Sequence, residues 1–153
     1  MVAVLHNPSK TPAFSVEERV AMLRELVGDR PRIEITSFHG LLVDFAKSQG
    51  AQFIVRGVRA FSDFEYEFQM ALMNRKLRPD LETVFMMPAD KYSYLSSRLV
   101  REVAQLGGSI QGLVPELVDQ SLHARLDPAY KLRDLVVEEA KLLKRKPKPR
   151  KKS

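Results

Sequence analysis

The sequence contains no cysteine and no tryptophan, and the absence of cysteine restricts its chemistry. Without cysteine the chain can form no disulfide, bind no metal through thiolates and use no thiol nucleophile. The three histidines, His6, His39 and His123, are scattered and show no metal-ligand spacing. The sequence therefore carries no signature of a cysteine or histidine metal centre, and it agrees with a reducing compartment.

Long apolar runs are absent as well. The longest apolar segments fall far short of the roughly 18 residues that a membrane span requires, and the N-terminus lacks the basic and then apolar layout of a signal peptide. We therefore expect a cytoplasmic protein. The 153 residues, of which 44% are hydrophobic, fit one globular domain with a single core.

Acidic residues are absent from the C-terminal segment 141–153, which carries eight lysines and arginines. The rest of the chain has 17 basic and 19 acidic residues, so the net charge of +6 comes from this segment. Its prolines and like charges predict a disordered basic tail at residues 144–153, preceded by an additional helix at 127–143. Such tails bind RNA or anionic surfaces loosely, or are solvated without a dedicated ligand, and the sequence leaves both open. The helix could pack on the domain or on a neighbouring subunit.

Short strands alternate with helices along the first 126 residues. The expected strands, which are rich in β-branched and aromatic residues, are residues 2–6, 32–38, 52–56 and 82–87. The expected helices are residues 15–27, 40–50, 62–77, 96–107 and 115–126. This alternation predicts an α/β fold with a Rossmann-like, doubly wound parallel sheet in one domain, residues 1–126.

Two of the expected helices begin with a capping-box pattern, in which a serine is followed by a glutamate three positions later. The pairs are Ser15 with Glu18 and Ser62 with Glu65. In the second of these helices the spacing predicts one buried apolar stripe, made of Phe64, Phe68, Ala71 and Leu72.

Polar residues suited to anions follow three of the expected strands. They are Lys10 after the first strand, Arg56 and Arg59 after the third, and Ser96 and Ser97 at the helix start after the fourth. Ligands of parallel sheets bind at the carboxyl ends of the strands, and helix N-termini attract phosphate. Taken singly, the serines could be ordinary helix caps and the arginines surface charges. Their coincidence on one rim favours a nucleotide or a phosphorylated substrate.

Three segments carry a family resemblance. In this order and spacing, NPSKTPAFSVEER, IVRGVRAFSDFEYEFQMALMNRKL and YSYLSSRLVREVAQLGG resemble bacterial phosphopantetheine adenylyltransferases of the nucleotidyltransferase superfamily, over roughly residues 1–125. The resemblance implies an adenine nucleotide alpha hydrolase-like fold and a homohexamer. It also implies that ATP and 4′-phosphopantetheine, with Mg²⁺, give dephospho-coenzyme A and pyrophosphate. Two alternatives stay open: a related nucleotidyltransferase with another phosphorylated acceptor, and a non-catalytic remnant whose basic tail binds RNA.

The resemblance also implies roles for matching residues. Lys10 and Arg56 would act as the catalytic pair that holds the phosphate of phosphopantetheine, and Leu42 would line the pantetheine channel. The residues on the nucleotide side would be Gly57, Val58, Arg59, Glu67, Tyr92, Ser93, Tyr94, Leu95, Ser96, Ser97 and Arg98. From the residues alone, Glu67 could instead pair with an arginine on its own helix, and Leu42 could belong to the core.

One part of the family pattern is not in this sequence. The family begins with a strand, a loop of the form YPGTFDPxTxGH and a helix, and neither His6 nor His39 stands in a Gly-His pair that could replace them. Both histidines are therefore interpreted as structural or pocket-edge residues. Because that strand is the central one of a sheet ordered 3-2-1-4-5, we expect two two-stranded pieces with apolar inner edges. We also expect the chain as printed to be inactive and poorly stable, through a start codon placed too late or a true truncation.

Overall fold

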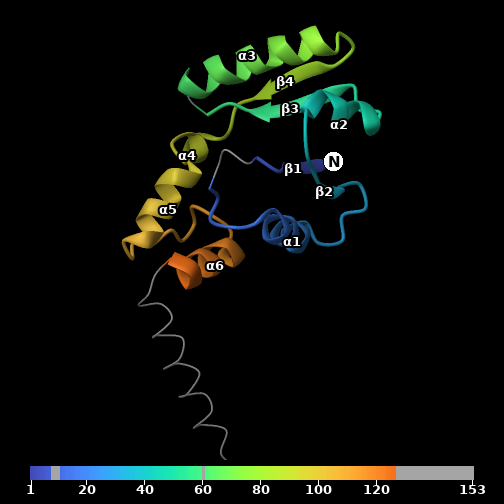
Figure 1. Cartoon of the computed structure of the whole chain (residues 1–153). Helices are drawn as coiled ribbons and strands as arrows, with labels where there is room; N and C mark the ends of the chain where they lie inside the picture. Colours follow the sequence, from blue (N-terminus) through green and yellow to red (C-terminus); the bar gives the residue numbers. More distant parts are fainter. Residues whose placement is uncertain (8–10, 60, 127–153) are drawn as a thin grey trace, which may run out of the picture. The chain divides into compact units, whose positions relative to one another are not determined.

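The computed structural model describes residues 1–7, 11–59 and 61–126. The chain divides into two compact units, Met1–Ser96 and Ser97–Ser153. In the first unit, strands and helices alternate (Figure 1) in the order β1 (Val2–Leu5), α1 (Val16–Val27), β2 (Ile35–Phe38), α2 (Leu42–Ser48), β3 (Phe53–Gly57), α3 (Phe61–Leu77), β4 (Glu82–Met86) and α4 (Asp90–Ser93). The second unit contains α5 (Ser97–Gln105) and α6 (Glu116–Leu126). The predicted helix at 127–143 and tail at 144–153 lie outside the described residues.

The four strands form two separate parallel pairs. β1 pairs with β2, from Val2 opposite Ile35 to Leu5 opposite Phe38. β3 pairs with β4 in the same parallel sense. The α/β class, the parallel direction and the division into two two-stranded pieces are confirmed. Within each pair both strands end at the same edge, so the residues that follow them are brought together.

Helix α1 begins as its sequence predicts. The Ser15 hydroxyl accepts a hydrogen bond from the Glu18 N–H over 3.2 Å, and the Ser15 N–H donates to the Glu18 carboxylate over 2.7 Å. The helix ends at Gly28, whose φ of 58° lies in the left-handed region that favours glycine. The capping box is confirmed because both of its hydrogen bonds are local and need no tertiary partner.

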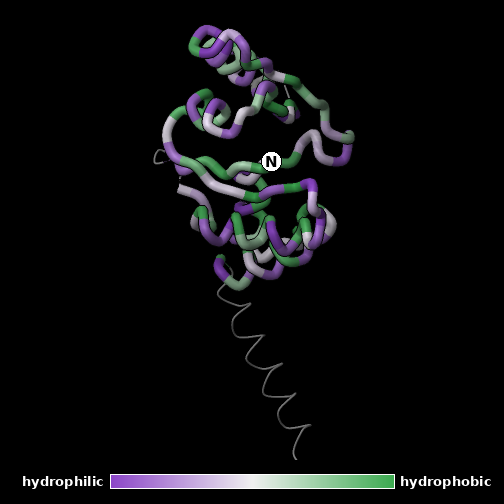
Figure 2. Tube along the Cα trace, turned by 90° about the vertical axis from the view of Figure 1, so that its right-hand side faces the viewer, coloured by the Kyte–Doolittle hydropathy of each residue, from purple (hydrophilic) through white to green (hydrophobic). Residues whose placement is uncertain are grey.

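Helix α3 differs from its prediction in two respects. It begins at Phe61, one residue before the predicted start at Ser62, and the side chain of Ser62, on which the predicted capping box depends, lies outside the described part of the structure. The predicted apolar stripe is also not buried, since Phe64 and Phe68 are 45% and 46% exposed and Leu72 is exposed too. Figure 2 shows hydrophobic and hydrophilic residues interspersed along the helices. A pair of strands gives a narrow surface, and one contact of α3 with it is the edge packing of Phe64 on Phe85 of β4.

The core of the first unit is built around α2. Its residues Val43 and Ala46 pack with Leu81, and Ile54 of β3 packs against them. On another side of the same helix, Phe45 stacks on Phe38 of β2, with ring centroids 4.3 Å apart. Helix α2 therefore contacts both strand pairs within one unit.

The second unit has its own small core. Its buried residues are Val100 and Ala104 of α5, Ile110 of the connection and Leu122 of α6. His123 of α6 also ties the helix to the residues after α5, because its Nε2 lies 3.2 Å from the carbonyl oxygen of Gly108.

In the described part of the chain, no helix combines the length and the apolar character that crossing a membrane requires.

Candidate functional site

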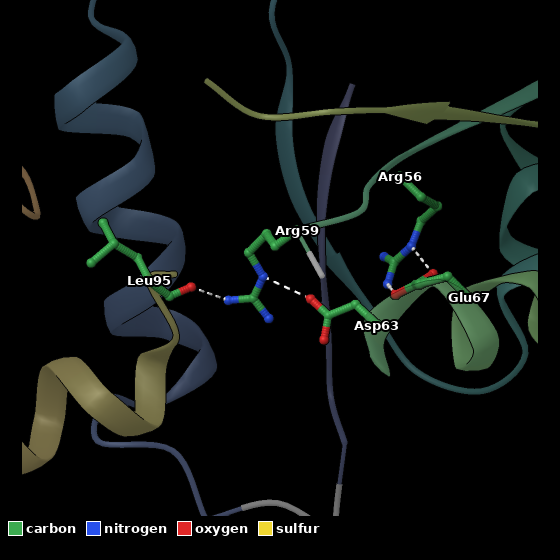
Figure 3. Close-up of polar contacts among 5 residues, drawn as sticks. All are labelled: Arg56, Arg59, Asp63, Glu67 and Leu95. Atoms are coloured by element: carbon green, nitrogen blue, oxygen red, sulfur yellow. Dashed lines mark hydrogen bonds and ion pairs between the residues drawn. The ribbon is translucent and has the colours of Figure 1, made fainter. Parts of the chain in front are cut away.

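Two arginines flank Gly57 at the carboxyl end of β3, and both are held by carboxylates of α3 (Figure 3). Arg56 is on the strand itself and Arg59 is two residues beyond its end. Because β3 runs into α3 through a short connection, the first turns of the helix lie beside the end of the strand. This local geometry places guanidinium groups and carboxylates together at one edge of the pair.

Arg56 makes a bidentate ion pair with Glu67. Its Nε donates to one carboxylate oxygen over 2.8 Å and its Nη2 donates to the other over 2.5 Å. The Glu67 side chain is only 14% exposed, whereas that of Arg56 is 46% exposed. The hydrogen bonds to Glu67 raise the pKa of the Arg56 guanidinium above its ordinary value, against the opposing effect of partial burial. Glu67 therefore pairs with an arginine, as the sequence allowed, but on β3 rather than on its own helix.

Arg59 connects two segments that are far apart in the sequence. Its Nε donates to a carboxylate oxygen of Asp63 over 2.9 Å, and its Nη1 donates to the backbone carbonyl of Leu95 (Figure 3). Asp63 belongs to the first turn of α3, whereas Leu95 follows α4. The planar guanidinium thus holds the residues after β3 and those after β4 in one arrangement.

The segment between β4 and the end of the first unit contains more secondary structure than a serine-rich loop would have. It contains the short helix α4, in which the Ser93 hydroxyl donates to the carbonyl of Asp90 over 2.7 Å. The ammonium group of Lys91 lies 4.7 Å from the centre of the Tyr92 ring. The Leu95 N–H donates back to the Tyr92 carbonyl over 3.2 Å. These contacts fix the backbone that presents the Leu95 carbonyl to Arg59.

Two histidines meet at the corresponding edge of the other strand pair. His6 follows β1 and His39 follows β2, and their rings stack with centroids 3.6 Å apart and an angle of 23° between planes. The His6 N–H donates to the carbonyl of Phe38 over 2.9 Å. Leu42, the first residue of α2, lies three positions after His39 and is half-buried. Sequence reasoning did not predict that the rings meet.

A metal centre is not evident in the described residues, where no group of three or more histidine, aspartate or glutamate side chains is arranged to hold an ion.

Comparison with known proteins supplies the family. The model of the cytidylyltransferase-like family matches residues 1–103. The chain is 54% identical over 126 residues to the phosphopantetheine adenylyltransferase of Anaeromyxobacter sp. (strain K), covering 82% of this chain and 77% of that protein. It is 52% identical over 122 residues to the protein of that name from Caldanaerobacter subterraneus subsp. tengcongensis, covering 80% and 76%. It is 51% identical over 127 residues to that from Geotalea daltonii, covering 83% and 79%.

The chain belongs to the phosphopantetheine adenylyltransferases, within the cytidylyltransferase-like family. The resemblance stated from its sequence motifs is thereby confirmed.

The residues expected on the nucleotide side of a phosphopantetheine adenylyltransferase fall in three segments, which are residues 57–59, Glu67 and residues 92–98. The structure brings the first and the third of these segments together. Val58 donates its N–H to the carbonyl of Met86 over 3.0 Å, while Arg59 binds the carbonyl of Leu95. The connection after β3 is therefore held both to the end of β4 and to the segment after α4.

The other residues expected in a phosphopantetheine adenylyltransferase site are placed as follows. Gly57 ends β3, Tyr92 and Ser93 belong to α4, Tyr94 is exposed, and Ser96 is half-buried at the end of the first unit. Ser97 and Arg98 open α5 in the second unit, where both are exposed. Leu42 is not part of the buried cluster, which uses its neighbours Val43 and Ala46. Lys10 lies outside the described residues. The individual binding roles of these residues stay predictions.

Sequence reasoning missed Asp63 as a partner of the site. The signal that could have revealed it is its spacing of four residues from Arg59, which places an acid within reach of the base once a helix begins between them.

Proposed function

We propose that this chain transfers the adenylyl group of ATP to 4′-phosphopantetheine, which gives dephospho-coenzyme A and pyrophosphate. The proposal is supported by the relatives named phosphopantetheine adenylyltransferase, because more than half of the residues aligned between them and this chain are identical. The structural observation that carries it is the pair of guanidinium groups, Arg56 and Arg59, each fixed by a carboxylate at the end of β3. Fixed cations at the carboxyl end of a parallel strand suit phosphates.

The proposed reaction is a direct displacement at phosphorus. A phosphate oxygen of 4′-phosphopantetheine forms a bond to the α-phosphorus of ATP, and the bond from that phosphorus to the bridging oxygen breaks. Pyrophosphate leaves with the electron pair. Because no covalent enzyme intermediate is needed, the protein contributes positioning and stabilisation of the negative charge that spreads over the oxygens.

Arg56 has donors left for a substrate phosphate. A guanidinium has five N–H donors, and Glu67 engages Nε and Nη2 along one edge. The edge that carries Nη1 is directed away from this carboxylate, and the side chain is partly exposed. In the proposal this edge binds the phosphate of the acceptor, while Glu67 fixes the plane in which the edge lies. Glu67 thus contributes through Arg56, in addition to the nucleotide-side role that the family resemblance implies.

The remaining residues are assigned to the two substrates as follows in this proposal. Lys10, which follows β1 in the sequence, and Leu42, the first residue of α2, serve the phosphate and the pantetheine arm of the acceptor together with Arg56 of β3. Arg59 and the residues around Leu95 serve ATP. Mg²⁺ bound with ATP would neutralise part of the charge on the leaving pyrophosphate.

We further propose a cytoplasmic homohexamer, which the family resemblance implies. The exposed apolar side chains of β3 and β4 support self-association, since Phe53 and Val55 are each 63% exposed. Light scattering of the purified protein would test the stoichiometry.

The test of the proposed function is pyrophosphate release with ATP and 4′-phosphopantetheine. It is run on the chain as printed and on a form extended upstream, in frame, by the family's first strand and GTFDP…GH motif. Release that requires both substrates, in either form, supports the proposal. No release by either form contradicts it. Release that is faster with another phosphorylated acceptor favours the related nucleotidyltransferase, and the same assay with nicotinate mononucleotide as acceptor provides this comparison.

A further inference from the structure

The stacked histidines at the end of β1 and β2 are not used by the reaction described above. His6 and His39 follow the last paired residues of their strands, Leu5 and Phe38. Their rings lie 3.6 Å apart at the centroids, and a backbone hydrogen bond from His6 to Phe38 continues the ladder beneath them. His39 is exposed and His6 is half-buried. Because neither ring belongs to the buried core, the stack has no evident purpose in the packing of the unit.

The stack joins two connections of the chain. His6 leads from β1 toward α1, and His39 leads through Gly40, whose φ is 83°, to Leu42 at the start of α2. In the turn between β2 and α2, the left-handed Gly40 allows the sharp change of direction. Leu41 at the N-cap makes no side-chain hydrogen bond to the helix. The start of α2 is therefore not fixed by a side-chain cap, and the ring of His39 on His6 is one contact that ties the turn to the end of β1.

Helix α1 contacts β1, the strand that ends immediately before His6.

We propose that His6 and His39 are positioning residues, whose ring stack holds the turn before α2, and with it Leu42, in the place that binds the pantetheine arm of the acceptor. This inference rests on the proposed function. It assigns the stack to the acceptor and not to ATP, because His39 lies in the turn that leads to Leu42 at the start of α2. Neither imidazole touches the reacting phosphorus in this account.

The experiment compares His39→Ala, which removes the stack, with His39→Phe, which keeps a flat ring of similar width. Binding of 4′-phosphopantetheine and of Mg-ATP to the full chain is measured separately by calorimetry, and unfolding of each variant is recorded. We expect His39→Ala to lower the affinity for 4′-phosphopantetheine by about threefold to tenfold, the range expected for one lost ring pair. The affinity for ATP should stay unchanged. His39→Phe should restore acceptor affinity, which a general loss of structure would not allow.

A double-mutant cycle with Leu42→Ala tests whether the histidines act through Leu42. If they do, His39→Ala has little further effect once Leu42 is truncated. Phe68→Ala is the matched control, because it removes one ring of another exposed stack, Phe64 on Phe68, on α3. It should leave acceptor affinity unchanged.

Equal losses of acceptor and ATP affinity, or a His39→Phe variant as weak as His39→Ala, would overturn the positioning role. So would acceptor affinity that is unchanged in His39→Ala. These outcomes are distinct from failure of the proposed function, in which the unsubstituted chain binds no 4′-phosphopantetheine and the inference falls with it.

Discussion

Arg59 donates a hydrogen bond to the backbone carbonyl of Leu95, a residue 36 positions further along the chain. The same guanidinium binds Asp63 through Nε. One side chain therefore links the connection after β3 to the segment after β4, and both contribute predicted nucleotide contacts. The first prediction follows from this link made by Arg59.

Arg59→Lys should weaken ATP binding. Lysine keeps the charge, but its ammonium group lacks the planar fork that reaches Asp63 and Leu95 together. Because one charge-assisted hydrogen bond is worth about 1.5–3 kcal/mol, we expect a loss of about tenfold or more in ATP affinity, measured by calorimetry. The control is Arg75→Lys, since Arg75 forms an exposed ion pair with Glu82. If both variants bind ATP equally well, the link made by Arg59 does not serve the nucleotide.

Arg56→Lys should lower the affinity for the acceptor more than the affinity for ATP. The bidentate contact with Glu67 orients the guanidinium, and lysine cannot reproduce this contact. We expect about tenfold weaker 4′-phosphopantetheine binding in a calorimetric titration.

Arg78→Lys is the matched control for this second prediction. Arg78 also makes a bidentate pair, with Asp80, but it follows α3 rather than β3. Unchanged acceptor affinity in Arg56→Lys, or an equal loss in Arg78→Lys, would remove Arg56 from the acceptor site.

The stability of the second unit should decrease as the pH rises through the folded-state pKa of His123. Burial lowers the pKa of His123, but hydrogen bonds to the carbonyls of Asp119 and Gly108 and to the Asp119 carboxylate outweigh it, so the pKa is raised above 6.5. A raised pKa means that the native state binds the proton more tightly than the unfolded state does. The stabilisation is therefore complete below pH 6.5 and is lost as the pH rises through the folded-state pKa.

Chemical unfolding from pH 5 to pH 9, compared with His123→Gln, would measure this effect. The two proteins should differ most at the acidic end, and the difference should shrink as the pH rises. A difference that grows with pH would show that the neutral imidazole is the form that stabilises the unit.

Val55→Thr and Val84→Thr should reduce self-association without loss of stability. These valines are cross-strand partners on β3 and β4, and they are 63% and 44% exposed. Threonine keeps the β-branched shape that strands favour, so the free energy of unfolding should change by less than about 0.5 kcal/mol. Light scattering should show smaller assemblies.

The control for the valine variants is Val43→Thr. Because Val43 is 5% exposed in the core cluster, its hydroxyl would be buried and the variant should lose about 1–3 kcal/mol of stability. Assemblies of unchanged size in Val55→Thr and Val84→Thr would place the subunit contact elsewhere.

What the sequence predicted correctly was either local or periodic. The capping box of Ser15 and Glu18 needs only four residues, and runs of β-branched residues predict the strands. The burial of the α3 stripe was predicted wrongly, because periodicity shows which residues share a face but not what covers that face. Phe64 and Phe68 lie on the expected face and stay half exposed.

The side-chain contacts of the site could not be read from the sequence in the same way. Glu67 lies 11 positions from Arg56, and no helical or strand period links them. The His6 and His39 stack follows from the register that sets Leu5 opposite Phe38, which is known only once the strands are paired. Motif resemblance indicated the candidate residues, whereas their mutual contacts required the fold.

Adenylyl transfer to a phosphorylated acceptor moves the α-phosphorus of ATP and not the γ-phosphorus, so an isotope experiment distinguishes it from other transfers. The protein is incubated with 4′-phosphopantetheine and ATP labelled either at the α-phosphorus or at the γ-phosphorus, in the printed and the extended forms. We expect the α label to appear in dephospho-coenzyme A and the γ label in pyrophosphate. Transfer of the γ label to the acceptor, or no labelled acceptor product from either form, would contradict it.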